Sequence, residues 1–248
     1  MPLWILCIIC MLAQFVDAIA GGGGIISLPA IVMYTSSMVT ALATNKMGAM
    51  FGSVSSATTF IKKGTVDIHL VKYWIPFTVV GSILGVQTVL MMDPAILNVL
   101  VTLLLVAMCV YTLLKKEFGF ESTFVGKTKR NIIIGAIIAF TMGFYDGFFG
   151  PGVGSFLIFL FVRFIGFDFI SGAGYGKTLN AVSNVTSFII FALNGAVNFY
   201  LGMVLAVFMM IGAILGTKCV LLKGSSLVKP VFIVVSMCLV CKIILEGL

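Results

Sequence analysis

Two lysines at matching positions in the two halves of the chain are the residues best suited to bind a charged ligand. Lys46 and Lys177 each lie between long apolar stretches, and each is expected to open a short helix inside a membrane. Burying an ammonium group there costs about 2.5–3.5 kcal/mol on insertion scales, so membrane proteins seldom keep one without a role. The alternative is a lysine whose long side chain reaches the membrane surface. Because the two lysines match, we favour the first interpretation, a binding site for an anion.

Polar residues around the lysines supply hydrogen-bond donors. Asn45 precedes Lys46 directly. Asn180 and Asn184 follow Lys177 and, being four residues apart, share one face of a helix. Their amide groups can donate hydrogen bonds to the oxygens of an oxyanion. The two lysines and the three asparagines therefore belong to the predicted substrate site.

Glycine-rich turns at residues 21–24 and 150–154 also occupy matching positions. Glycine allows backbone conformations that turn N–H groups toward a ligand, and a helix that follows directs the positive end of its dipole there. Such a turn suits an anion, whereas the alternative is a tight hairpin that lets helices pack closely. The glycines alone do not decide between the two. The turn residues included in the predicted substrate site are Gly22, Gly23, Pro151 and Gly152.

Two aspartates, Asp17 and Asp146, precede these turns at matching positions. They are candidates for carrying a proton in coupled transport, for pairing with the lysines, or for capping the turns, and pairing or capping ranks first. Arg163 has no charged counterpart, because Tyr34 stands at the matching position. Asp168 is a candidate partner for this arginine.

The matches between the halves keep one register, which indicates an internal repeat. Residues 15–23 align with residues 144–152 at an offset of 129. After two extra residues the offset becomes 131, and it holds from Lys46 through residues 81–85, which align with residues 212–216. Chance matches would not keep one register over this length. Each half is therefore expected to form the same structure.

The composition requires a membrane environment for most of the chain. Of the 248 residues, 61% are hydrophobic and 9% are charged, and the mean hydropathy is +1.23, whereas a soluble domain has about 25% charged residues. The net charge of +7 is divided among short loops, which argues against nucleic acid as a partner. The sequence has one histidine and no set of nucleophile, base and orienting residues, so we expect no enzyme activity and no cofactor.

The apolar segments predict the helices that hold the site. The first half has segments at roughly 2–20, 24–44, 46–61, 73–92 and 95–114, and the second half at roughly 131–149, 153–172, 177–193, 197–217 and 229–245. The two segments that begin at the lysines have about 16 residues and would reach about 24 Å, less than the hydrocarbon core of about 30 Å. Interruptions at residues 35–37 and 163–168 predict broken helices.

Basic residues in the loops predict the orientation of the two halves. Loops 62–72, 115–130 and 217–229 contain several lysines, whereas loops 86–95 and 193–203 contain no lysine or arginine. The basic loops all lie in the cytoplasm only if each half crosses the membrane an odd number of times. The halves would then be inverted repeats, as in many secondary transporters.

The predicted fold is an all-α integral membrane protein with about ten (eight to ten) transmembrane segments, in two inverted repeats that contain glycine-rich broken or short helices. Residues 1–114 form the first repeat, residues 115–130 the cytoplasmic linker and residues 131–248 the second repeat. Transporters built in this way bind substrate between the repeats, near the middle of the membrane. The lysines, the aspartates and the glycine turns fall in matching parts of the two repeats, as such a site requires.

At these positions the sequence resembles the sulfite exporter TauE/SafE family, also called TSUP, and within it the YfcA-like branch. The resemblance rests on residues 21–24, 43–46, 143–152 and 177–184, and it extends over nearly the whole chain. It implies a multi-pass transporter in the bacterial inner membrane that carries sulfur-containing anions such as sulfite or sulfonates, and other organic anions in some members. Arg163 stands outside the family pattern, so the choice of substrate is left open.

The predicted function is transport of small anions by alternating access around the lysine pair, and the resemblance implies sulfur-containing oxyanions as substrates. The alternatives are an anion channel of the same fold and a carrier of small organic carboxylates. The expected partners are the anionic substrate and the lipid bilayer, and a homodimer is left open.

Overall fold

The computed structural model describes residues 1–114 and 122–223, with side chains for 1–104 and 122–222, and these residues form helices joined by short turns. The helices are α1 (Leu3–Ala20), α2 (Gly24–Thr35), α3 (Met38–Lys62), α4 (Ile68–Val71), α5 (Ile75–Met91), α6 (Pro94–Leu114), α7 (Lys129–Phe148), α8 (Val153–Leu160), the π-helix η1 (Phe161–Ile165), α9 (Phe169–Leu193) and α10 (Phe199–Lys223). The all-helical class is confirmed for this part of the chain. The predicted segment 229–245 and residues 115–121 of the linker 115–130 lie outside it.

Two helix breaks fall where the sequence predicts interruptions. Ser36 takes a left-handed conformation with φ of 55°, and the hydroxyl of Ser37 accepts a hydrogen bond from an N–H in the first turn of α3. In the second half, Gly166 ends η1 with φ of 85°, and the carboxylate of Asp168 caps α9. Each break therefore ends one helix at a left-handed residue and starts the next at a capping side chain.

The predicted starts of the lysine-bearing helices are wrong. α3 begins at Met38 and α9 at Phe169, so Lys46 and Lys177 lie about two turns inside helices of 25 residues each. No proline interrupts either helix before its lysine, and lysine itself favours a helix. Thr44 and Asn45 could cap a helix, but their side chains accept hydrogen bonds from Asn198 and Ser27 instead. Charge was therefore a poor marker of the helix start. Each helix reaches about 37 Å, enough to cross the hydrocarbon core.

The two extra residues of the second half lie between its first two long helices. α2 has 12 residues, whereas α8 and η1 together run from Val153 to Ile165 and contain one more. A π-helix commonly accommodates such an insertion. The second extra residue lies in the break, which spans 36–37 in the first half and 166–168 in the second.

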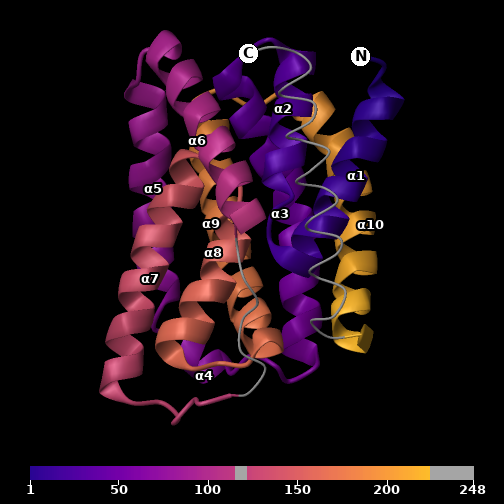
Figure 1. Ribbon diagram of the computed structural model, residues 1–248. Helices are drawn as coiled ribbons and strands as arrows, with labels where there is room; N and C mark the ends of the chain where they lie inside the picture. The colour runs from indigo at the N-terminus through magenta and orange to yellow at the C-terminus, as the bar shows by residue number, and fades with distance from the viewer. Residues whose placement is uncertain (115–121, 224–248) are drawn as a thin grey trace.

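Helices of the first half of the chain pack against helices of the second half (Figure 1). α3 lies against α9, α1 against α10, and α5 against α7. Glycines allow the last two contacts, because a Cβ on Gly212 would lie 2.1 Å from the Met11 carbonyl oxygen, and one on Gly81 would lie 2.3 Å from that of Phe140. These two contacts join matching residues of the two halves in reciprocal fashion.

The basic loops gather at one end of the bundle. Figure 1 shows α4, the start of α7 and the end of α10 at this end, and the N-terminus at the other. Lys127 links two of the loops, because its ammonium group donates a hydrogen bond of 3.3 Å to the Tyr73 hydroxyl and lies 4.5 Å from the centre of the ring. Which side of the membrane this end faces stays a prediction.

Three helices of the described residues are long and apolar enough to span a membrane by length and composition, namely Leu3–Ala20, Lys129–Phe148 and Phe199–Leu222. Shorter apolar helices include Gly24–Thr35 and Ile75–Met91. α3 and α9 are long but contain serine, threonine, asparagine and lysine along their length, which lowers their mean hydropathy. The chain is a membrane protein by these helices and by its composition, and the number of full crossings stays a prediction.

Candidate functional site

Each buried lysine forms an ion pair with an aspartate of the other half. Lys46 Nζ lies 2.6 Å from Asp146 Oδ1, and Lys177 Nζ pairs with Asp17 Oδ2. The lysines are 3% and 1% exposed, so neither side chain reaches a surface of the protein. Of the roles considered for the aspartates, the structure contains pairing with the lysines for both, and capping of the first glycine turn for Asp17. A proton-coupling role stays a prediction.

Each ion pair joins an aspartate near the end of one helix to a lysine in the interior of another helix. Asp17 and Asp146 lie near the C-terminal ends of α1 and α7, whereas Lys46 and Lys177 lie in the middle of α3 and α9. The pairing exchanges partners between matching positions, since the lysine of one half takes the aspartate of the other. Breaking one pair alone would leave a buried charge without a partner, which is strongly destabilising.

An amide side chain supports each carboxylate, but the two amides come from different helices. Asn180 on α9 donates a hydrogen bond of 3.1 Å to Asp146 Oδ2, and Gln14 on α1 donates one of 3.3 Å to Asp17 Oδ2. The repeat register matches Gln14 with Gly143, and Asn180 with an alanine. The halves therefore have the same chemistry at the carboxylate through different residues.

The glycine turns are buried and pack against each other. A Cβ on Gly21 would lie 2.2 Å from the carbonyl carbon of Gly154, and one on Gly24 would lie 2.9 Å from the Cα of Pro151. Side chains at these positions would force the two turns apart. Close packing, the alternative considered for these glycines, is therefore part of their role.

Several backbone N–H and carbonyl groups of the glycine turns form hydrogen bonds within the protein. The N–H of Gly23 donates a hydrogen bond of 3.2 Å to Asp17 Oδ1, so this turn binds an internal carboxylate. The carbonyl of Gly22 accepts from Ile25, and that of Pro151 accepts from the Tyr145 hydroxyl at 2.8 Å. These contacts stabilise the turns and hold one aspartate in place.

Gly150 and Gly152 take left-handed conformations in the second turn, with φ of 94° and 82°. A Cβ on Gly150 would lie 3.0 Å from Asp146 Oδ1 and 3.1 Å from Lys46 Nζ. The backbone of this turn therefore passes directly beside the ion pair. Any side chain at position 150 would occupy the space next to the two charges.

The other two predicted asparagines hydrogen-bond to serines instead of to the ion-paired residues. Asn45 accepts a hydrogen bond of 2.8 Å from the Ser27 hydroxyl and so ties α3 to α2. Asn184 donates one of 3.4 Å to the Ser53 hydroxyl. Ser53 and Asn184 match each other in the repeat register. A contact between matching residues marks the place where equivalent parts of the two halves meet.

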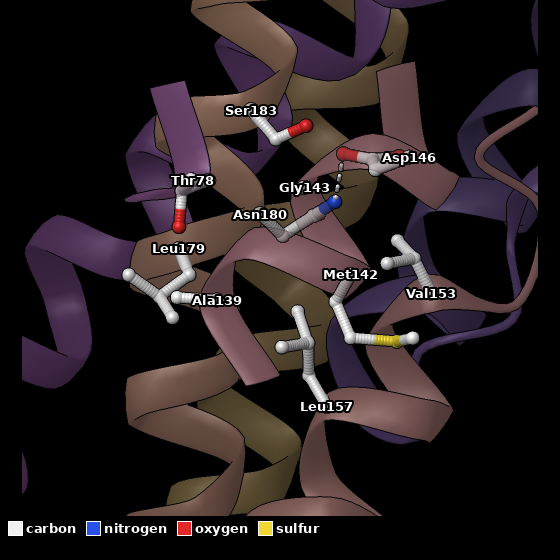
Figure 2. Close-up of a pocket in the computed structure, with 10 residues that line it drawn as sticks. All are labelled: Thr78, Ala139, Met142, Gly143, Asp146, Val153, Leu157, Leu179, Asn180 and Ser183. Atoms are coloured by element: carbon white, nitrogen blue, oxygen red, sulfur yellow. Dashed lines mark hydrogen bonds between the residues drawn. The ribbon is translucent and has the colours of Figure 1, made fainter. Parts of the chain in front are cut away.

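A narrow pocket lies beside Asp146. Its lining includes Thr78, Asn180, Ser183 and Leu157, and Figure 2 shows the Asn180 amide directed at the Asp146 carboxylate, with the Ser183 hydroxyl nearby. The pocket is too narrow to admit a sphere of the size of a water molecule. The site is therefore closed in this conformation.

One buried hydroxyl near the centre has no partner in the described residues, Ser187 Oγ. Its match in the first half, Ser56, accepts a hydrogen bond of 2.8 Å from the Thr217 hydroxyl. The residue that matches Thr217 is Val86, which has a methyl group where threonine has its hydroxyl. The divergence of the repeats therefore explains the unpaired serine.

The predicted pairing of Arg163 with Asp168 is wrong. Arg163 is exposed in η1, and the Asp168 carboxylate instead accepts hydrogen bonds from the N–H and the hydroxyl of Ser171. A capping role competes for this carboxylate, because a free N–H at the helix start must be satisfied.

Cys7 and Cys10 are buried free thiols of α1, and Cys109, Cys238 and Cys241 lie outside the residues with described side chains.

Comparison with known proteins decides the family. The profile of the sulfite exporter TauE/SafE family matches residues 6–243. The chain belongs to the TauE/SafE family. The resemblance drawn from the sequence is thus confirmed, and the protein is a membrane transporter of this family.

The curated relatives match over nearly their whole length. Probable membrane transporter protein YfcA of Escherichia coli is 35% identical over 245 residues, covering 99% of this chain and 90% of that protein. A probable membrane transporter protein of Haemophilus influenzae is 34% identical over 234 residues, covering 94% and 91%. Probable membrane transporter protein ORF9 of a Sinorhizobium species is 31% identical over 235 residues, covering 95% and 89%. No solved structure matches the chain.

Gln14 was not predicted as part of the site. It is a polar residue, only 5% exposed, three positions before Asp17 in an otherwise apolar helix. Side chains three residues apart on a helix lie on the same face. This spacing from Asp17 was the signal that could have identified Gln14. It was missed because the matching residue in the other half is Gly143, which has no polar side chain.

Proposed function

We propose that this transporter carries small anions by alternating access between two inverted repeats, and that the substrates are sulfur-containing oxyanions such as sulfite and sulfonates. The family description names sulfite. The names of the curated relatives give no substrate. We further propose that the protein lies in the bacterial inner membrane, as the resemblance implies.

The reciprocal ion pairs are the observation that carries this proposal. Lys46 and Lys177 are held by carboxylates of the opposite half, so a movement of one half against the other must break both pairs. A buried ammonium group left alone is costly, but an incoming anion can take the place of the carboxylate. Positive charge in the protein interior is thus available to an anion when the halves move.

Inverted repeats account for the pattern of contacts. The lysines exchange aspartates, α1 and α5 each pack against the other half, and α1 and α7 start from opposite ends of the bundle (Figure 1). Matching residues Ser53 and Asn184 meet between α3 and α9, on the axis that would relate the halves. Transporters of this type bind substrate at the interface of the repeats.

The pocket beside Asp146 is closed, as expected both for a carrier in part of its cycle and for a channel between openings. A carrier passes through closed states in each cycle, whereas a channel needs a continuous water-filled path when open. The pocket admits no water-sized sphere. A channel and a carrier of small carboxylates are the alternatives that the transport assay separates.

The assay measures uptake of radiolabelled sulfite, methanesulfonate and acetate into vesicles that contain the purified protein. We expect saturable uptake of sulfite or methanesulfonate, and loss of this uptake in Lys46→Ala and in Lys177→Ala. Lys62→Ala is the matched control, because Lys62 is an exposed lysine on the same helix as Lys46. Uptake at the wild-type rate by both variants of the buried lysines would rule out the mechanism.

Two further results would select the alternatives. Flux that does not saturate with concentration indicates a channel, and saturable uptake of acetate alone indicates a carboxylate carrier. Because Lys46→Ala leaves Asp146 without its partner, the double variant Lys46→Met with Asp146→Asn serves as a second test. It removes the ammonium group while keeping the buried site neutral.

A further inference from the structure

The two ion-paired regions differ, and the difference bears on where an anion binds. We define the Asp146 half-site as Asp146, Lys46, Asn180, Ser183 and Thr78. Asp146 accepts from two side chains, the Lys46 ammonium group at 2.6 Å and the Asn180 amide at 3.1 Å. Ser183 and Thr78 line the pocket beside it, where the Ser183 hydroxyl accepts a hydrogen bond of 2.8 Å from Ser82 and the Thr78 hydroxyl donates one of 3.4 Å to the Trp74 carbonyl.

The aspartate of the corresponding Asp17 half-site has more hydrogen-bond donors within the protein. Asp17 accepts from Lys177, from the Gln14 amide at 3.3 Å and from the N–H of Gly23 at 3.2 Å. The Gln14 side chain lies over Gly52, where an added Cβ would come within 2.8 Å of it. Asp17 therefore accepts from three donors of the protein, one more than Asp146, although its side chain is 14% exposed and that of Asp146 is 2% exposed.

The residues beside the two aspartates differ at matching positions. Gly143 stands where the first half has Gln14, and Ser183 stands where it has Gly52. The Gln14 side chain of the first half-site thus has no counterpart in the second, and a hydroxyl group is present instead. Figure 2 shows the Ser183 and Asn180 side chains on the same side of the pocket as Asp146.

We propose that the substrate anion binds in the Asp146 half-site, to Lys46 Nζ and the Asn180 amide, together with one proton that Asp146 takes up. The inference rests on the proposed function and adds the half-site and the coupling ion. The proton from solution bonds to a carboxylate oxygen of Asp146, and the neutral carboxyl group releases the ammonium group to the anion. For a monovalent anion the half-site is uncharged before and after binding.

Charge balance is the physical reason for coupling. The empty half-site contains one positive and one negative charge in contact, with side chains 4% and 2% exposed. An anion bound without a proton would leave Asp146 as an unpaired buried charge, which is strongly unfavourable. With the proton, the carboxyl group becomes a hydrogen-bond donor as well as an acceptor. Anion and proton therefore stabilise each other in the site.

Asp146 is the group in this half-site that can take the proton. α3 presents Lys46 to it, and α9 presents Asn180, while Lys177 on α9 is paired with Asp17. α5 and α8, which complete the pocket, contain no titratable residue. The hydroxyl of Tyr145, the neighbour of Asp146 on α7, donates to a backbone carbonyl of the turn.

The test measures anion and proton movement together in vesicles that contain the full-length protein and a trapped pH-sensitive dye. The probe is radiolabelled methanesulfonate, a monovalent anion that keeps its charge near neutral pH. We expect the wild type to move about one proton with each anion. Asp146→Asn should exchange labelled for unlabelled anion but move no proton, because an amide mimics the protonated carboxyl group and cannot release a proton.

Asp17→Asn is the matched comparison, because it makes the same change at the matching position. Any uptake that this variant retains should still move protons at the wild-type ratio to anions. Proton movement by Asp146→Asn, or its loss in Asp17→Asn alone, would overturn the inference. Absence of labelled anion uptake by the wild type would instead refute the proposed function itself, so the two failures are distinguishable.

Binding to the wild-type protein provides a second test that needs no variant. If one proton is taken up with each anion, the apparent Kd for methanesulfonate should rise about tenfold per pH unit wherever the empty site is deprotonated. Thermal stabilisation of the purified protein by the anion measures this Kd. The same Kd across the neutral and mildly acidic range would overturn the inference, whether or not Asp146→Asn folds.

Discussion

Removing one partner of a buried ion pair tests the site through stability, independently of transport. Lys46→Met leaves the Asp146 carboxylate without its ammonium partner in a place where both side chains are nearly inaccessible, at 4% and 2% exposure. At 2.6 Å the attraction of the two charges is about 6 kcal/mol with an effective dielectric constant of 20, and desolvation of both groups offsets much of it. Breaking such a pair costs about 3–5 kcal/mol, whereas replacing both partners is close to neutral.

We therefore expect Lys46→Met to lower the free energy of unfolding by about 3–5 kcal/mol, and Lys46→Met with Asp146→Asn to lower it by less than either single change. Denaturation of the purified protein in mild detergent, followed by circular dichroism, measures these values. Lys177→Met should have a smaller effect, since the side chain of its partner Asp17 is 14% exposed. Additive single effects, or a loss below about 0.5 kcal/mol for Lys46→Met, would refute the assignment of a buried coupled pair.

Three further predictions concern packing, an unpaired hydroxyl and a surface tyrosine. Val86→Thr should stabilise the protein by about 0.5–1.5 kcal/mol in the same denaturation assay, because its hydroxyl can pair with Ser187 Oγ. Gly81→Ala should lower the free energy of unfolding by about 1–3 kcal/mol, because its Cβ would lie 2.3 Å from a carbonyl oxygen of α7. The hydrogen bond and positive charge of Lys127 lower the pKa of Tyr73, so Lys127→Ala should raise the pH at which ultraviolet absorbance reports this phenolate.

Each of these three predictions has a control or a contradicting result in the same assay. Val86→Thr should bring no gain in a Ser187→Ala background, and an equal gain there would contradict the proposed hydrogen bond. Gly172→Ala should cost less than the change at position 81, since its nearest contact is a side-chain methyl of Val162 at 3.1 Å. An unchanged Tyr73 titration after Lys127→Ala would show that the two side chains do not interact in solution.

The sequence predicted which charged residues occupy matching positions, but it did not predict where the helices that carry the lysines begin. The repeat register placed Lys46 and Lys177, and Asp17 and Asp146, at matching positions, and the structure brings all four into two buried ion pairs. The helix starts at the lysines were wrong, because a lysine inside an apolar region resembles a boundary in composition. The Lys46 ammonium group pairs with the carboxylate of Asp146, which is 100 residues away in the sequence. Local periodicity cannot reveal such a partner.

The amide donors were predicted in part, because hydrogen-bond partners depend on packing between helices. Asn180 reaches Asp146, whereas Asn45 binds Ser27 instead. Gln14 was missed because the halves diverge at this point. The internal repeat therefore identifies the position of the site, but the differences between the halves decide which side chains surround each aspartate.

The position of a bound anion tests the central claim most directly. Selenite can stand in for sulfite, and because the methionines contain sulfur, anomalous diffraction at the selenium edge would locate the anion without ambiguity. The account predicts a selenium peak within hydrogen-bond distance of Lys46 Nζ and the Asn180 amide, with the Asp146 carboxyl group displaced from the lysine. A peak only among the lysines of the exposed loops, with both buried ion pairs intact, would contradict it.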